Sequence, residues 1–240
     1  MFGIHPNTVR LYEEWGVIPK AKRKSNGYRV STEVHIQQLH LVRMALQIEI
    51  LQNGLRKQVI EVVKQSANGQ FDEAFIHAQD YLSHIRREQK NAKEAIIIAK
   101  EIWKGSPETD EIQLKRKEVS DLLDVSMDTL RNWEMNGLLK IKRKTNGYRV
   151  YTSEDVRRLK VIRSLRCANY SLEAILHMLN EAEVNPQVNI AKALNVSREN
   201  SDIISVCDRL IESLQKAEVN AIRIITMLES MKVKFSKPPL

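Results

Sequence analysis

The spacing of apolar residues predicts two long helices in this chain. After Ile203, apolar residues recur in alternating steps of four and three, which is the pattern of a coiled-coil seam. This seam comprises Cys207, Leu210, Leu214, Ala217, Ala221, Ile224, Leu228 and Met231. An earlier series, interrupted by one polar residue, comprises Phe75, Ala78, Leu82, Ile85, Gln89, Ala92, Ile96, Ala99 and Trp103. Because an apolar stripe left in water favours aggregation, we expect the two helices to pack against each other.

Shorter patterns before the second long helix predict a helix-turn-helix. Residues 117–123 have helical apolar spacing, and Ser126 is a suitable N-cap for a helix over residues 127–136 that ends at Gly137. Two short helices joined by a tight turn form this motif, and the second helix enters the major groove of DNA. The side chains that would then face the bases are Asp128, Thr129 and Arg131.

A β-hairpin is predicted over residues 140–151. It contains Asn146 and Gly147 between basic and β-prone residues, which favours a two-residue hairpin turn. Such a wing would offer cations to phosphate groups, and Tyr148 and Tyr151 would add hydroxyl groups and ring packing. The alternative is a solvated basic hairpin without a partner.

Two further helices are predicted after the hairpin. Thr152 and Asp155 form a capping box for a helix over residues 153–167, and Ser171 N-caps a short helix over residues 172–180. The complete order of helix, turn, helix, wing and two helices is more specific than a helix-turn-helix alone.

The same module occurs twice in the chain. The segment Thr8–Glu13 recurs as Thr129–Glu134, at an offset of 121 residues, and Lys22–Val30 recurs as Lys142–Val150 after one residue is dropped. The match continues through the following helix, so each copy is a whole module. The first copy starts at the position of Leu122 in the second. We therefore expect it to lack the first helix, either because the start is misassigned or because this copy is weakened.

We therefore expect a mainly α protein with two winged helix-turn-helix domains, each with a small β-hairpin wing and each followed by a long coiled-coil-type dimerisation helix. The expected parts are the first module at 1–70, a long helix at 71–104, a linker at 105–112, the second module at 113–181, a long helix at 198–232 and a tail at 233–240. The segment from Lys104 to Ile112 can reach up to about 30 Å at ~3.3 Å per residue. The two long helices can therefore pair within one chain as a pseudo-dimer. The alternative is a homodimer of chains with four heads, where a head is one winged helix-turn-helix module.

Charge favours a polyanionic partner. Lysine and arginine total 38 against 30 acidic residues, which gives a formal charge of +8 and favours binding to phosphates. The two cysteines, Cys167 and Cys207, have no paired spacing, which is typical of a reducing cytoplasm rather than of a disulfide framework. We expect a cytoplasmic protein without a membrane partner, because no apolar run approaches the roughly 18 residues of a membrane span and the N-terminus has no secretory pattern.

The segments Thr129–Glu134, Gly137–Leu139 and Asn146–Tyr151 resemble the MerR family of bacterial transcription regulators, and the first copy has the same marks in Thr8–Glu13 and Asn26–Val30. The resemblance covers nearly the whole chain. It implies winged-helix binding of double-stranded DNA and dimerisation through a long antiparallel helix pair. It also implies promoter control by bending and untwisting an over-long spacer, with RNA polymerase as a further expected partner at the promoter.

The side chains expected to contact DNA lie on the recognition helix and wing of each copy. In the first copy they are Asn7, Thr8, Arg10, Tyr12, Lys22, Arg23, Lys24, Asn26, Tyr28 and Arg29. In the second copy they are Asp128, Thr129, Arg131, Trp133, Lys142, Arg143, Lys144, Asn146, Tyr148 and Arg149. The second copy has Asn132, Trp133 and Tyr151 where the first has Leu11, Tyr12 and Ser31, so we expect the copies to prefer different half-sites.

Other functions remain as alternatives. The same module could bend DNA as an accessory or architectural protein, or serve as a protein-interaction module if the first head no longer binds DNA. A metal-responsive regulator is a further alternative because Cys207 lies near the start of a long helix, although it has no second thiol nearby and fits the seam. No catalysis and no cofactor are expected, since the sequence has no Gly-rich phosphate loop, zinc motif or nucleophile elbow.

Overall fold

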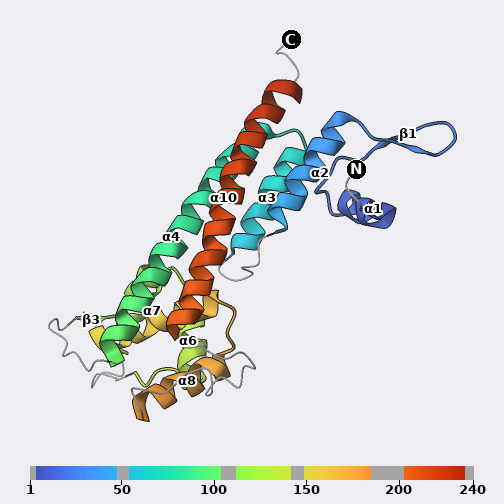
Figure 1. The fold of residues 1–240 in the computed structure, drawn as a ribbon. Helices are drawn as coiled ribbons and strands as arrows, with labels where there is room; N and C mark the ends of the chain where they lie inside the picture. Colours follow the sequence, from blue (N-terminus) through green and yellow to red (C-terminus); the bar gives the residue numbers. More distant parts are fainter. Residues whose placement is uncertain (1–3, 48–53, 104–111, 142–148, 185–202, 236–240) are drawn as a thin grey trace. The chain divides into compact units, whose positions relative to one another are not determined.

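The computed structural model describes residues 4–47, 54–103, 112–141, 149–184 and 203–235. The described chain is mainly helical, with a few two-residue strands (Figure 1), which confirms the predicted fold class. It divides into two compact units: unit 1 comprises Met1–Glu88 and Ser213–Leu240, and unit 2 comprises Gln89–Glu212. Both long helices cross this division, so each unit contains part of each of them. None of the helices in the described ranges is long and apolar enough to span a membrane.

Unit 1 contains the first copy of the module. Its elements are α1 (Pro6–Glu14), β1 (Lys22–Arg23), β2 (Arg29–Val30), α2 (Glu33–Ala45), α3 (Leu55–Ala67), the first part of α4 (Phe71–Trp103) and the last part of α10 (Ile203–Phe235). Proline at the first position of α1 suits a helix start, because that position needs no N–H donor. The ring Nδ1 of His5 accepts a hydrogen bond from the Asn7 amide at 3.3 Å and caps the helix. The described part of unit 1 has no helix ahead of α1.

Unit 2 contains the second copy. Its elements are the rest of α4, β3 (Gln113–Leu114), α5 (Arg116–Leu123), α6 (Met127–Met135), β4 (Tyr151–Thr152), α7 (Ser153–Cys167), α8 (Leu172–Val184) and the first part of α10. The pairing of β3 with β4, which puts Leu114 opposite Tyr151, was not predicted from the sequence.

The predicted helix starts of the second copy are confirmed. The Ser126 hydroxyl accepts from the Thr129 amide at 3.0 Å, and the Ser171 hydroxyl accepts from the Ala174 amide at 3.1 Å. Thr152 and Asp155 form the predicted capping box. Each of these interactions joins residues three apart, which is why the local sequence was sufficient to predict them.

The seam of α10 is also confirmed, since all eight predicted residues are buried. In α4 only every second position of the predicted seam is right. The buried residues common to prediction and structure are Ala78, Ile85, Ala92 and Ala99. The other seam positions are Ala74, Tyr81, Glu88 and Ala95, and not Phe75, Leu82, Gln89 and Ile96, which are only partly buried; the side chain of Trp103 lies outside the description. Either set of four residues gives steps of three and four with the common positions. The sequence favoured the set that begins at Phe75 because it contains the larger apolar side chains Phe75, Leu82 and Ile96.

Unit 2 has a closed core where unit 1 has an open face. In unit 2, Val119 and Leu123 of α5 belong to one buried cluster with Leu130, Trp133 and Val156. At the position of Val156, which is 4% exposed, unit 1 has Ile36, which is 45% exposed. The difference follows from α5, because unit 1 has no described helix in the equivalent position.

Candidate nucleic-acid interface

The recognition helix of unit 2 is α6, and it has one face in the core and one in solvent. Leu130 and Trp133 point into the buried cluster, whereas Asp128, Arg131 and Asn132 are exposed. The cap at Ser126 fixes the first turn, where the hydroxyls of Ser126 and Thr129 also lie 2.8 Å apart. Arginine and short polar side chains are thus presented near the N-terminal end of the helix, as base readout requires.

The recognition helix of unit 1, α1, has the same division. Asn7, Arg10 and Leu11 are exposed, whereas Val9 and Tyr12 face the body of the unit and are partly buried. The predictions that place Asn7, Thr8 and Arg10 on the recognition helix therefore agree with the positions of these residues, since Thr8 is partly exposed.

Burial contradicts one predicted DNA contact. The indole of Trp133 is 4% exposed and belongs to the core cluster of unit 2, so it has no surface left for DNA. Its counterpart Tyr12 is half-buried and lies against Trp15, with ring centroids 6.0 Å apart. Outward positions at Leu11 and Asn132 were not among the predicted contacts, although they lie four residues after Asn7 and Asp128, so helical periodicity would have indicated them.

The wing of unit 1 is the hairpin of β1 and β2, in which Arg23 lies opposite Arg29. The two-residue turn predicted at Asn146 and Gly147 of the second copy lies outside the described residues, and the turn in unit 1 has three residues. The Gly27 amide donates to the Lys24 carbonyl at 2.9 Å, and the Lys24 amide donates to the Tyr28 carbonyl at 2.9 Å, so the loop has three residues, 25–27. Gly27 has φ +83°, the left-handed conformation that this three-residue turn requires at its last position.

The side chains at the tip of this wing are in solvent. Those predicted to contact DNA and found exposed are Lys22, Arg23, Lys24, Asn26 and Tyr28. In the second copy, the predicted residues Lys142, Arg143, Lys144, Asn146 and Tyr148 lie outside the described residues. A row of exposed cations with one exposed phenol ring can neutralise and hydrogen-bond a phosphate backbone.

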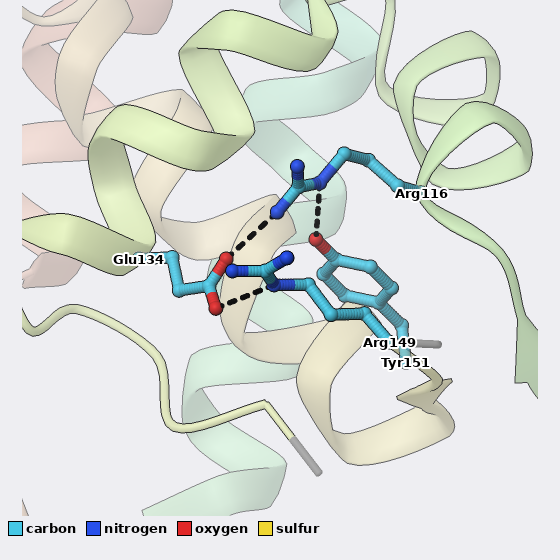
Figure 2. Close-up of polar contacts among 4 residues, drawn as sticks. All are labelled: Arg116, Glu134, Arg149 and Tyr151. Atoms are coloured by element: carbon cyan, nitrogen blue, oxygen red, sulfur yellow. Dashed lines mark hydrogen bonds and ion pairs between the residues drawn. The ribbon is translucent and has the colours of Figure 1, made fainter. Parts of the chain in front are cut away.

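An acidic side chain of each recognition helix binds an arginine, which is Arg29 in β2 of unit 1 and Arg149 just ahead of β4 in unit 2. In unit 2, Glu134 accepts hydrogen bonds from Arg149 at 2.7 Å and from Arg116 at 2.8 Å, and Arg116 also donates to the Tyr151 hydroxyl at 3.4 Å (Figure 2). The Tyr151 hydroxyl is the main cause that raises the pKa of Arg116, and Glu134 adds to it, so this guanidinium stays charged. The ring of Tyr151 is buried and its hydroxyl accepts from Arg116, so Tyr151 packs in unit 2 and, contrary to the prediction, does not offer its ring to DNA from the wing.

Unit 1 has the same pair with fewer partners. Arg29 donates from Nε to the Oε2 of Glu13 at 3.0 Å, and the Ala21 amide donates to the Oε1 of Glu13 at 3.2 Å. Sequence reasoning assigned Arg29 and Arg149 to phosphate contacts and missed their pairing with an acidic residue. The repeated Glu in both copies, at matching positions ahead of a repeated Arg, was the available signal.

The described residues offer no group of three or more His, Cys, Asp or Glu side chains that could hold a metal ion. Both cysteines, Cys167 and Cys207, are buried, and Cys207 occupies the seam of α10 as predicted.

A comparison with protein families agrees with the two helix-turn-helix modules described above. The family described as MerR HTH family regulatory protein matches residues 1–57 and 114–182, slightly more than half of the chain. The chain belongs to the MerR HTH family. Both matched segments contain a recognition helix and the residues around it, so the family relationship holds for both copies, and the family is one of DNA-binding transcription regulators.

Relatives in the MerR family match parts of this chain. The HTH-type transcriptional regulator ZntR of Escherichia coli K12 is 36% identical over 64 residues, which are 26% of this chain and 45% of ZntR. The HTH-type transcriptional regulator CueR of Escherichia coli O6:H1 is 39% identical over 46 residues, 19% of this chain and 34% of CueR. The mercuric resistance operon regulatory protein of Bacillus cereus is 22% identical over 112 residues, 46% of this chain and 82% of that protein. The chain thus spans less than half the length of ZntR and CueR, and it matches no solved structure.

Proposed function

We propose that this MerR-family chain is a sequence-specific transcription regulator that binds double-stranded DNA as an intramolecular pseudo-dimer. In this proposal one polypeptide supplies both heads and both dimerisation helices. The observation that carries it is an exchange of helices: within each unit, one copy's head packs with part of the other copy's long helix.

The exchange in unit 1 joins the first copy to α10, the long helix of the second. Asn220 of α10 donates to Gln47 at 3.3 Å, and Lys234 of α10 forms an ion pair with Glu33 of α2. The two long helices of this unit also pair along their length. Arg86 binds Glu218 at 2.8 Å and Lys232 binds Asp72. Residue numbers increase from Asp72 to Arg86 along α4, whereas those of their partners decrease from Lys232 to Glu218 along α10. The two helices are therefore antiparallel.

The exchange in unit 2 joins the second copy to α4, the long helix of the first. Three residues of α7 contact α4: Arg157 binds Glu101 at 2.9 Å, Lys160 binds Glu94 at 2.6 Å and the Ser164 hydroxyl donates to the Asn91 carbonyl at 3.4 Å. These surface ion pairs contribute about 0 to 1 kcal/mol each, so they indicate geometry more than stability. The apolar seams supply the stability, and both are buried by residues of this chain. A second chain is therefore not needed to cover either seam.

The DNA-facing part of the proposal rests on the exposed arginines of both recognition helices and the exposed cations of the wing. At a promoter, the two heads would bind the halves of one operator, and RNA polymerase would be the partner whose access the bound protein changes. Names of the relatives, all transcriptional or operon regulators, support regulation over a purely architectural role.

The decisive experiment combines selection of bound duplexes from a random DNA pool with a light-scattering mass. We expect one chain of 27.8 kDa in free solution and one chain per selected duplex, with an enriched, imperfect inverted repeat. A mass of two chains, free or bound, would overturn the pseudo-dimer. Transcription from a reporter carrying the selected site should change on addition of the protein; binding without such a change would assign the chain to the accessory DNA-bending class. Arg10→Ala and Arg131→Ala should each weaken binding, and an effect of Arg131→Ala alone would show that the first head does not engage DNA.

A further inference from the structure

We infer that the two heads read half-sites that share one base pair and differ at its neighbour, with Leu11 in α1 and Asn132 in α6 as the residues that select the differing base. Arg10 and Arg131 would read the shared base pair. This inference rests on the proposed binding of DNA and specifies what each head recognises there.

The scaffolds that hold the two recognition helices are alike. Both helices have nine residues and start at a side-chain cap. Both bind an arginine through a glutamate on their inner side. In unit 1 Glu13 binds Arg29, and in unit 2 Glu134 binds Arg149. Equivalent positions on α1 and α6 should therefore meet equivalent positions of a half-site.

The outward faces of the two helices differ almost completely. Exposed positions at equal places along α1 and α6 are Pro6 and Met127, Asn7 and Asp128, Arg10 and Arg131, Leu11 and Asn132, and Glu14 and Met135. Only the arginine is the same in both. These differences lie on the exposed face and do not alter the ion pairs on the inner side of each helix. We therefore expect them to change the bases that a head recognises and not the position of its recognition helix.

The difference between Leu11 and Asn132 changes the base that each side chain would prefer. Leu11 is 43% exposed and has no hydrogen-bonding group, so in the major groove it favours contact with the thymine methyl. Asn132 has an amide, and asparagine pairs with the N6 and N7 atoms of adenine. In unit 2 the amide of Asn136 donates to the Oδ1 of Asn132 at 2.5 Å, which holds the Asn132 side chain in place.

The next turn of each helix extends the contrast. At the place of Asn136, unit 1 has Trp15, which is exposed. Leu11 and Trp15 are four residues apart, as Asn132 and Asn136 are, so each pair lies on one face of its helix. Unit 1 thus presents two apolar side chains where unit 2 presents two linked amides. Arginine prefers guanine O6 and N7, so we expect a shared guanine beside a thymine in one half-site and beside an adenine in the other.

The test is selection from a random DNA pool with the full chain, Leu11→Asn and Asn132→Leu, and with Leu122→Asn as a control. Leu122 is an exposed leucine of α5 and lies outside the recognition helices. We expect unequal half-sites for the full chain and for the control. Leu11→Asn should make both half-sites carry adenine, and Asn132→Leu should make both carry thymine.

A second measurement tests the methyl contact directly. Replacing the selected thymine by deoxyuridine removes only the methyl group, and we expect about four-fold weaker binding by the full chain, the effect of one buried methylene-sized group. Leu11→Asn should show no such loss. Identical half-sites for the full chain, or equal affinity for thymine and deoxyuridine, would overturn the inference while leaving DNA binding intact. No enrichment of any duplex would instead overturn the proposed function.

Discussion

Arg149 donates from Nε to the Oε1 of Glu134 at 2.7 Å, and so joins the segment just ahead of β4 to the recognition helix (Figure 2). Glu13 and Arg29 form the same pair in unit 1. The two residues of each pair are 15 or 16 positions apart, so the interaction fixes the wing region against the helix and is not part of local helix geometry. We therefore propose that these arginines position the DNA-binding parts, and that the exposed wing cations bind phosphates.

The first prediction separates these two kinds of cation in the same wing. Replacing Lys24 by Ala should lower the slope of log affinity against log salt by about 0.9, the value for one lost phosphate contact on duplex DNA. Arg29→Ala should weaken binding but leave the slope nearly unchanged, because Glu13 already neutralises this guanidinium. The measurement is DNA affinity at several salt concentrations. An equal fall in slope for both variants would assign Arg29 to the phosphates.

The second prediction concerns Glu134. Glu134→Gln keeps the shape of the side chain and removes its charge, so simple electrostatics predicts tighter binding to DNA. We expect weaker binding, by about three-fold, because a partly exposed ion pair that orients the wing contributes about 0.5 to 1 kcal/mol. Glu173→Gln, which removes an exposed charge from α8, is the matched control. Tighter binding by Glu134→Gln than by this control would show that the pair has no orienting role.

The third prediction follows from the open face of unit 1. Val156→Ala should lower the free energy of unfolding by about 2 kcal/mol, because it leaves a cavity in a closed core. Ile36→Ala, at the equivalent position, removes more atoms but should cost under about 1 kcal/mol, since the side chain is nearly half exposed. Denaturant unfolding of both variants measures the difference. Equal costs would mean that Ile36 is covered in solution.

The fourth prediction concerns alkaline pH. Burial in the seam raises the pKa of the Tyr81 phenol above its usual range. The unfolded chain therefore loses this proton first, from about pH 10 upward. The tyrosine lowers the free energy of unfolding there by up to about 1.4 kcal/mol per pH unit, until the folded form also ionises.

Tyr81→Phe removes this titration and should lose less stability between pH 8 and pH 11 than the original chain. Other groups titrate equally in both proteins and cancel in the comparison. Denaturant unfolding at the two pH values measures the effect, and parallel losses in both proteins would contradict it.

Local signals in the sequence predicted much of the fold. The caps at Ser126, Thr152 and Ser171 depend on residues three apart, and the internal repeat made the order of elements visible twice. Errors arose where the answer depends on distant residues. Which positions of α4 form the seam depends on the helix packed against it.

The same reason explains the errors at the candidate interface. Trp133 lies in the recognition helix, but it is buried in a cluster with residues of α5 and α7. The ion pair of Arg149 with Glu134 joins two elements, so helical or strand periodicity cannot predict it. The placement of arginines and wing cations on exposed surface was predictable because each follows from the period of its own element.

The unlike outward faces of α1 and α6 have a consequence for heredity. In a regulator built from two identical subunits, one altered codon changes both contacts at once, and the operator must change symmetrically to keep pace. In the proposed pseudo-dimer Leu11 and Asn132 are encoded separately, so each half of the proposed binding site could change together with its own head. Such a site would have a direction, and the bound protein would distinguish the upstream side of a gene from the downstream side.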